Sequence, residues 1–131
     1  MKKVFLGGTC NNSTWRDQLI PMLKIDYFNP IVDDWTKEAQ QEEIKQRKIC
    51  DFVLYVITPK MKGVYSIAEL IDDSNKCPEK TIFCFLYKDE NDIFTESELK
   101  SLIQVGKIAK RNGATYCSSL IKVAEFLNKQ L

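Results

Sequence analysis

Six consecutive apolar residues, Phe52–Ile57, constrain the fold of this chain more than any other stretch. The run is followed by Thr58-Pro59 and is too short for a buried helix, so it predicts a β-strand. Because no polar residue interrupts the run, both faces of the strand must be covered by other parts of the protein. Buried strands of this kind are typical of parallel sheets with helices on both sides.

The segment after this strand reads as a loop followed by a helix. Ser66 and, three residues later, Glu69 match the capping-box pattern, so we expect a helix from Ser66 to Lys76 with Glu69 in its first turn. In parallel sheets, ligands bind at the carboxyl ends of the strands and close to helix N-termini. Glu69 therefore has two interpretations, as a helix cap and as a catalytic carboxylate that faces a pocket.

The rest of the chain alternates between strand and helix patterns, which predicts one three-layer α/β domain over residues 1–131 with a five-stranded parallel sheet. We expect the flavodoxin-like or Rossmann-like strand order 2-1-3-4-5, with a crevice flanked by the loops Gly7–Asn12 and Thr58–Ser66. The other strands are expected at residues 3–6, 27–30, 81–87 and 114–117, the other helices at residues 15–23, 37–49, 96–112 and 120–131, and a charged turn at residues 89–92.

The chain contains no histidine, and this narrows the chemistry available to it. Ser-His and Cys-His nucleophiles are excluded, so any catalysis must use carboxylates, tyrosine, lysine or cysteine. The five cysteines form no Cys-x-x-Cys pair, and we therefore expect no metal site and no cofactor. The cysteines are interpreted as reduced, buried apolar residues, except Cys10, which the loop after the first strand can expose.

Charge and hydropathy patterning set the expected surroundings of the protein. The formal net charge is +1, which gives no argument for binding nucleic acid. No apolar run approaches the roughly 20 residues that cross a membrane, and the start of the chain does not have the pattern of a signal peptide. We expect a cytoplasmic protein that binds neither nucleic acid nor a membrane.

Two features beside the predicted crevice can hold an anion. Gly7, Gly8 and Thr9 allow the backbone to approach a ligand closely, although they equally suit a tight strand-to-helix turn. They do not complete a dinucleotide-binding or Walker motif. Arg16, at the start of the first helix, can reach a phosphate, and a position on the surface is the alternative.

Acidic residues after the second strand also have two interpretations. Asp33, Asp34 and Trp35 can hold sugar hydroxyls and stack on a base, or they can form a turn that caps the next helix. Glu43 lies on the strongly polar helix Lys37–Ile49, where exposure to solvent is the usual outcome. Spacing alone does not separate a site from a solvated surface at these positions.

Four segments of the chain, Val4–Thr9, Tyr27–Pro30, Ile49–Leu54 and Gly63–Leu70, match a known pattern. Together they resemble the nucleoside 2-deoxyribosyltransferase superfamily, and most of all its nucleoside 2-deoxyribosyltransferase-like branch, over about residues 3–87. The most specific part is Ser66-x-x-Glu69, which resembles the Thr-x-x-Glu end of the family signature.

This resemblance implies an enzyme that breaks an N-glycosidic bond with carboxylates alone. It assigns the role of nucleophile to Glu69 and that of a supporting acid to Glu43, eight residues before Asp51. The nucleophile would attack the anomeric carbon, release the base and form a glycosyl-enzyme that another base or water resolves. The implied partner is a small nucleoside or nucleotide, and a homo-oligomer is a further implication because neighbouring subunits often complete such sites.

The same resemblance divides the other candidate residues between sugar and base. Two positions depart from the family pattern, since Gly63 replaces an aspartate that contacts the base and Phe5 replaces a tyrosine near the nucleophile. The sugar or its phosphate is expected at Gly7, Gly8, Thr9, Arg16 and Ser66, the sugar edge or base at Asp33 and Trp35, and the rest of the lining at Cys10, Asp34, Gly63 and Tyr65.

Two main hypotheses about function follow. The first is an N-glycosidase or N-glycosyltransferase that acts on a nucleoside, a nucleotide or a related nucleotide-sugar. The second is a non-catalytic module that binds or senses a nucleotide ligand, and the departures at Gly63 and Phe5 favour it. A flavodoxin-like partner domain without a small ligand is a third, weaker interpretation.

Overall fold

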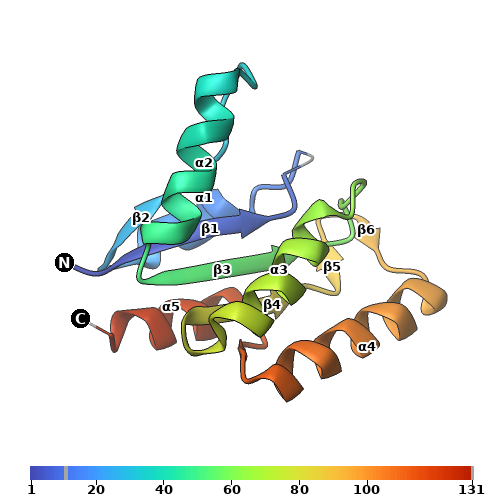
Figure 1. Ribbon diagram of the computed structural model, residues 1–131. Helices are drawn as coiled ribbons and strands as arrows, with labels where there is room; N and C mark the ends of the chain where they lie inside the picture. The colour runs from blue at the N-terminus through green and yellow to red at the C-terminus, as the bar shows by residue number, and fades with distance from the viewer. Residues whose placement is uncertain (11, 131) are drawn as a thin grey trace.

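A parallel sheet forms the centre of the protein, as the apolar run Phe52–Ile57 predicts (Figure 1). The computed structural model describes residues 1–10 and 12–130. The sheet contains β1 (Lys3–Gly8), β2 (Asp26–Phe28), β3 (Phe52–Ile57), β4 (Thr81–Phe85) and β7 (Thr115–Tyr116). These strands pair in parallel in the order β2-β1-β3-β4-β7, which confirms the predicted order.

Helices cover both faces of this sheet, so the three-layer α/β arrangement is confirmed. The helical segments are α1 (Trp15–Leu19), the 3-10 turn η1 (Ile20–Met22), α2 (Lys37–Ile49), α3 (Tyr65–Lys76), the 3-10 turn η2 (Pro78–Lys80), α4 (Glu96–Asn112) and α5 (Leu120–Asn128). Within the described ranges, none of these helices combines the length and the apolar character needed to cross a membrane.

The strand side chains alternate between two cores. On one face Leu54 and Val56 of β3 pack with side chains of α1 and α5. On the other face Val53 and Tyr55 pack with side chains of α3 and α4. Every residue of β3 is buried, which agrees with the period-two alternation of side chains across a strand covered on both sides.

One helix differs from the others, because α2 stands clear of the sheet over much of its length (Figure 1). Thr36 caps it by accepting a hydrogen bond from the backbone N–H of Ala39 at 3.1 Å. Its apolar residues Ile44 and Ile49 are both 59% exposed. The predicted polar helix is therefore confirmed, and apolar burial contributes little to its attachment.

The expected capping box at Ser66 and Glu69 is wrong. Helix α3 begins at Tyr65, with Val64 as the N-cap residue and no side-chain cap. Glu69 accordingly lies in the second turn and is only 7% exposed. The backbone is already helical before Ser66, since the N–H groups of Ile67 and Ala68 donate to the Val64 carbonyl at 3.1 and 3.2 Å, so Ser66 lies inside the first turn and cannot act as the N-cap residue. A complete capping box does form at Thr95 and Glu98, before α4.

The charged turn expected at residues 89–92 is present at residues 90–91, where it joins a small antiparallel hairpin of β5 (Lys88–Asp89) and β6 (Asp92–Ile93). Asp89 is buried and accepts a hydrogen bond from the Ser13 hydroxyl at 2.6 Å. Lys60 pairs with Glu90 and Asp92 at 3.5 and 3.2 Å. The hairpin thus braces both the loop after β1 and the loop after β3.

Candidate active site

A cavity of about 440 Å³ opens beside the carboxyl end of β1, between α2 and the loop that leads into α3. This volume lies within the range of small-molecule sites. Its position matches the crevice expected between the first and third strands. Most of the candidate residues line it, namely Gly7, Gly8, Thr9, Cys10, Arg16, Trp35, Glu43, Gly63, Tyr65, Ser66 and Glu69.

Asp33 and Asp34 are the candidates that the structure does not bring to the cavity. Both side chains are exposed, and neither is among the residues that line it. Their neighbour Trp35 lies at the cavity edge and is 56% exposed. Together with Ile31 and Val32 it forms an apolar rim on the α2 side.

The glycines at the end of β1 allow very close packing of two strands. Gly8 has a φ of 120°, and a Cβ placed there would lie 2.1 Å from the carbonyl oxygen of Val56. The adjacent Thr9 donates its backbone N–H to the same carbonyl at 2.9 Å. The Thr9 hydroxyl accepts from the N–H of Thr58 at 3.0 Å. The tight turn and the cavity lining are therefore both present, and the same residues serve them.

Arg16 is buried, at 5% exposure, so the surface position considered for it is wrong. Its guanidinium donates to the carbonyls of Leu6, Thr9 and Gly8 at 3.1, 2.7 and 3.4 Å. Burial lowers the pKa of Arg16 to about 10, and nearby negative charge, including that of Glu43, only partly opposes this effect. The side chain braces the loop after β1, and three of its hydrogen-bond donors are already used there.

Glu69 projects from α3 into the cavity and carries a strongly perturbed carboxyl group. Burial raises the pKa of Glu69 to about 7, and the charges of Glu43, Asp73 and Asp72 raise it further, while Arg47 lowers it. Glu69 is therefore partly protonated near neutral pH. The second-turn position offers Glu69 no free backbone N–H groups.

Glu43 lies across the cavity on α2. It is half-buried, unlike its exposed neighbour Glu42, so the solvated surface position is wrong for Glu43 and right for Glu42. Burial raises the pKa of Glu43, and the positive charges of Arg16 and Arg47 oppose that effect. Two carboxyl groups with raised pKa values thus line one cavity, which is typical of acid–base sites.

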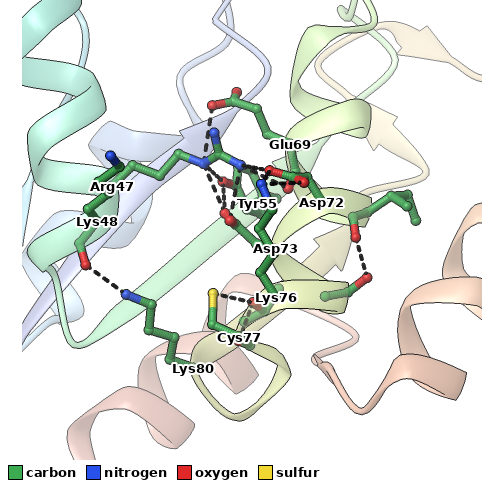
Figure 2. Close-up of polar contacts among 12 residues, drawn as sticks. Arg47, Lys48, Tyr55, Glu69, Asp72, Asp73, Lys76, Cys77 and Lys80 are labelled. Carbon is green, nitrogen blue, oxygen red and sulfur yellow. Dashed lines mark hydrogen bonds and ion pairs between the residues drawn. The ribbon is translucent and has the colours of Figure 1, made fainter.

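Arg47, Tyr55 and Asp73 form a polar network behind Glu69 that sequence reasoning missed (Figure 2). Arg47 lies 3.6 Å from the Glu69 carboxylate and 3.0 Å from that of Asp73. The Tyr55 hydroxyl donates to Asp73 at 2.5 Å. A signal existed for two of the three, since Arg47 follows Glu43 and Asp73 follows Glu69 by four residues, the spacing of one helix face. Tyr55 is hidden inside the apolar run.

The cysteines contribute little to this cavity. Cys10 is exposed and lines the cavity, as the loop position predicts. Cys50, Cys84 and Cys117 are buried and Cys77 is half-buried, and all are free thiols. Across residues 1–10 and 12–130, no group of three or more acidic or cysteine side chains is arranged to hold a metal ion.

Comparison with known families agrees with this geometry. The family described as nucleoside 2-deoxyribosyltransferase like matches residues 1–87 of the chain. That range includes every cavity-lining residue and the network of Arg47, Tyr55 and Asp73. Among curated proteins, none matches the chain.

Proposed function

Because the chain belongs to the nucleoside 2-deoxyribosyltransferase-like family, we propose that it cleaves or transfers the N-glycosidic bond of a nucleoside, a nucleotide or a related nucleotide-sugar. The observation that carries this proposal is the pair of carboxyl groups, Glu43 and Glu69, that lines a single cavity of suitable size. Glycosidic chemistry needs two carboxyl groups in different protonation states.

In this mechanism Glu69 acts as the nucleophile. Its carboxylate attacks the anomeric carbon while the bond from that carbon to the base nitrogen breaks, and the electron pair of that bond leaves with the base. Glu43, whose pKa burial raises, donates a proton to the departing base. A second base or a water molecule then attacks the glycosyl-enzyme and restores the Glu69 carboxylate.

The cavity lining supports a division between sugar and base. Its floor carries polar groups, including Thr9 and Ser66, which suit sugar hydroxyls or a phosphate. Its rim carries Trp35 and Tyr65, which suit the flat face of a base. Contribution of a neighbouring subunit, and therefore a homo-oligomer, stays a prediction.

The test is release of free base from a panel of nucleosides, nucleoside 5′-phosphates and nucleotide-sugars, followed by chromatography, with and without a second base as acceptor. We expect Glu69→Gln to lower turnover by at least about a thousandfold, because the nucleophile is lost. Glu42→Gln, a change at an exposed acid on the same helix as Glu43, serves as the matched control. Base release by folded Glu69→Gln at the wild-type rate would overturn the assignment.

A second function has a specific observation in its favour. Gly63 adds no side chain to the cavity, and Phe5 is buried with no hydroxyl to offer the site. The protein would then bind or sense a nucleotide ligand without turning it over. Thermal-shift measurements with the same panel separate the two functions, since ligand-dependent stabilisation without released base supports binding alone.

A further inference from the structure

The attachment of α2 to the rest of the protein depends on polar contacts more than on apolar packing. Lys80 donates to the carbonyls of Lys48 and Cys50, each at 3.0 Å, at the end of the helix. Gln46 is the buried residue of this helix, and Ile44 and Ile49 face solvent. Arg47 reaches from α2 to α3 and ends in a cluster of acidic side chains (Figure 2). An arginine held at several points is well ordered, because its planar fork loses little freedom for each added bond.

The geometry of this cluster fixes the guanidinium firmly. Nε and Nη2 of Arg47 each lie 3.0 Å from one carboxylate oxygen of Asp73, a bidentate arrangement. Nε also donates to the Tyr55 hydroxyl at 3.1 Å, and Nη2 donates to Asp72 at 3.1 Å. Asp73 is 7% exposed, so the main partner of Arg47 is well shielded from water.

The two carboxyl groups of the cavity are placed differently with respect to this charge. Nε of Arg47 lies 3.6 Å from Oε2 of Glu69. Across the described part of the chain, Arg47 forms ion pairs with Glu69, Asp72 and Asp73, and Glu43 is not among them. Of the cations near Glu43, Arg16 has the larger effect and Arg47 the smaller.

We propose that Arg47 is a positioning residue that favours the ionised form of Glu69 through a direct ion pair, and that holds α2 against α3 so that both carboxyl groups face one cavity. The inference rests on the proposed function for its kinetic consequence, which is that Glu69 is ionised often enough near neutral pH to act as the nucleophile. The charge assignment itself is a property of the folded protein and does not require turnover.

Every other influence on Glu69 acts against its ionisation. Burial and the charges of Glu43, Asp72 and Asp73 all raise its pKa, and Arg47 lowers it. The nearby hydroxyl of Tyr55 is neutral, because burial and the adjacent Asp73 raise its pKa above the usual value. Loss of Arg47 would therefore leave only burial and acidic neighbours acting on Glu69, and the pKa of Glu69 would rise.

The test is a titration of the glutamate side-chain carboxyl carbons by NMR in wild type, Arg47→Gln and Arg47→Lys. Signals are assigned with Glu69→Gln and Glu43→Gln. An opposite charge at this range moves a carboxyl pKa by about one unit or more. We expect Arg47→Gln to raise the pKa of Glu69 by that amount, which lowers its ionised fraction at neutral pH several-fold, and to move Glu43 less.

Lysine keeps the charge and loses the bidentate fork. We therefore expect Arg47→Lys to hold the pKa of Glu69 closer to its wild-type value than Arg47→Gln does. Lys76→Gln is the matched control, since it removes an exposed cation that pairs with Asp72 at 3.0 Å. It should leave the titration of Glu69 unchanged.

The kinetic counterpart is the pH profile of kcat/KM. Its rising limb should move to higher pH in Arg47→Gln by the same amount as the NMR titration, which a purely structural role would not produce. Absence of base release by wild type would overturn the proposed function and would leave the NMR result standing.

Three outcomes overturn the inference itself. These are an unchanged pKa of Glu69 in folded Arg47→Gln, a fall in that pKa because α2 moves away and water enters, and a shift of Glu43 as large as that of Glu69. If Arg47→Gln does not fold, Arg47→Lys takes its place. Because a lysine ammonium lacks the bidentate fork, it is held less closely beside Glu69, so the pKa of Glu69 should rise by a smaller amount, and a fall would overturn the inference.

Discussion

Two arginines, Arg16 in the cavity lining and Arg47 behind Glu69, hold their surroundings by different means. Arg16 is 5% exposed and donates to backbone carbonyls of the loop after β1. Arg47 is partly exposed and binds carboxylates on α3. Burial lowers the pKa of Arg16 to about 10, whereas hydrogen bonds and charge from Asp73 outweigh burial and raise the pKa of Arg47.

The two arginines therefore affect different properties. Arg16 affects the structure of the loop after β1, and Arg47 affects the ionisation of Glu69. Backbone carbonyls do not titrate, so the Arg16 side keeps the same geometry over the physiological pH range. Beside Arg47, in contrast, burial raises the pKa of Glu69 to about 7, so this carboxyl group titrates near neutral pH. The loop held by Arg16 therefore keeps its structure as pH changes. Beside Arg47, protonation of Glu69 can change both the stability of the protein and the chemistry of the cavity.

The largest effect on stability is expected from the loss of Arg16. Arg16→Met would remove this donor from the carbonyls of Leu6, Gly8 and Thr9, although Thr9 would still accept from the Trp15 indole N–H at 2.7 Å. Each buried group left unsatisfied costs about 1–3 kcal/mol. We expect the free energy of unfolding, measured with urea, to fall by about 3 kcal/mol or more. The loss should be equal at pH 6 and pH 8, because the pKa of Arg16 stays at about 10.

Arg111→Met is the control for this prediction, because Arg111 is an exposed arginine on α4. Its removal should change the free energy of unfolding by no more than about 0.5 kcal/mol. A similarly small loss for Arg16→Met would contradict the view that the loop after β1 depends on this side chain.

The next largest effect on stability is expected from the loss of the ion pair between Arg47 and Asp73. Asp73→Asn removes the bidentate partner of Arg47, and loss of one member of a buried pair leaves the other charge uncompensated. We expect the free energy of unfolding to fall by about 2 kcal/mol, and by less than the sum of the single changes when Asp73→Asn is combined with Arg47→Gln. Additive losses would mean that the pair does not act as a unit.

The third effect on stability depends on pH, because it arises from the ionisation of Glu69 beside Arg47 and has no counterpart beside Arg16. The pKa of Glu69 is about 7 in the folded protein and near 4.5 when unperturbed, so the folded state binds the proton more tightly. Below about pH 4 both states are protonated. As pH rises through 4.5 to 7, the unfolded state ionises first and the folded protein loses stability.

Glu69→Gln cannot ionise and should therefore become more stable than wild type as pH rises. We expect no difference in the free energy of unfolding near pH 4 and an advantage of at most about 3 kcal/mol at pH 8, since each tenfold change in acidity between 4.5 and about 7 corresponds to about 1.4 kcal/mol. Urea unfolding at a series of pH values measures it. An advantage that is constant with pH would contradict the raised pKa of Glu69.

The sequence predicted the sheet because the governing patterns are local. The apolar run Phe52–Ile57 and the alternating strand and helix segments identify the elements, and the crossover rules then limit their order. The start of α3 could not be predicted, because a Ser-x-x-Glu spacing fits a helix start and a position inside a helix equally well, and here Val64 is the N-cap residue without a side-chain cap. Local spacing does not tell the two apart.

The candidate site was predicted in part for a related reason. The strand-end position of Gly8 and the Ser66-x-x-Glu69 pattern indicated a cavity, and both lie at it. The roles of Arg16 and Arg47 depend on which groups the fold brings near them, and an arginine on a helix looks the same in sequence whether it meets carbonyls, carboxylates or water. The partners, and hence the pKa of Glu69, required the tertiary structure.

The smallest effect on stability is expected at Gly63, in the loop that leads into α3. A Cβ there meets no atom within 4 Å, whereas at Gly8 it would lie 2.1 Å from the Val56 carbonyl oxygen. Gly63→Ala should change the free energy of unfolding by no more than about 0.5 kcal/mol, and Gly8→Ala by several-fold more. Equal losses at the two positions would mean that the loop before α3 is as constrained as the end of β1.

The same open space makes Gly63→Asp a probe of the base side of the cavity. The carboxylate would add a hydrogen-bond acceptor beside an apolar rim without displacing any atom. We therefore expect the ratio of kcat/KM between bases that offer an N–H donor and bases that do not to rise about tenfold, since one added hydrogen bond supplies about 1 kcal/mol or slightly more. Gly63→Asn, with the same shape and no charge, is the matched control. An unchanged ratio in both variants would place the base away from Gly63, towards Trp35 and α2.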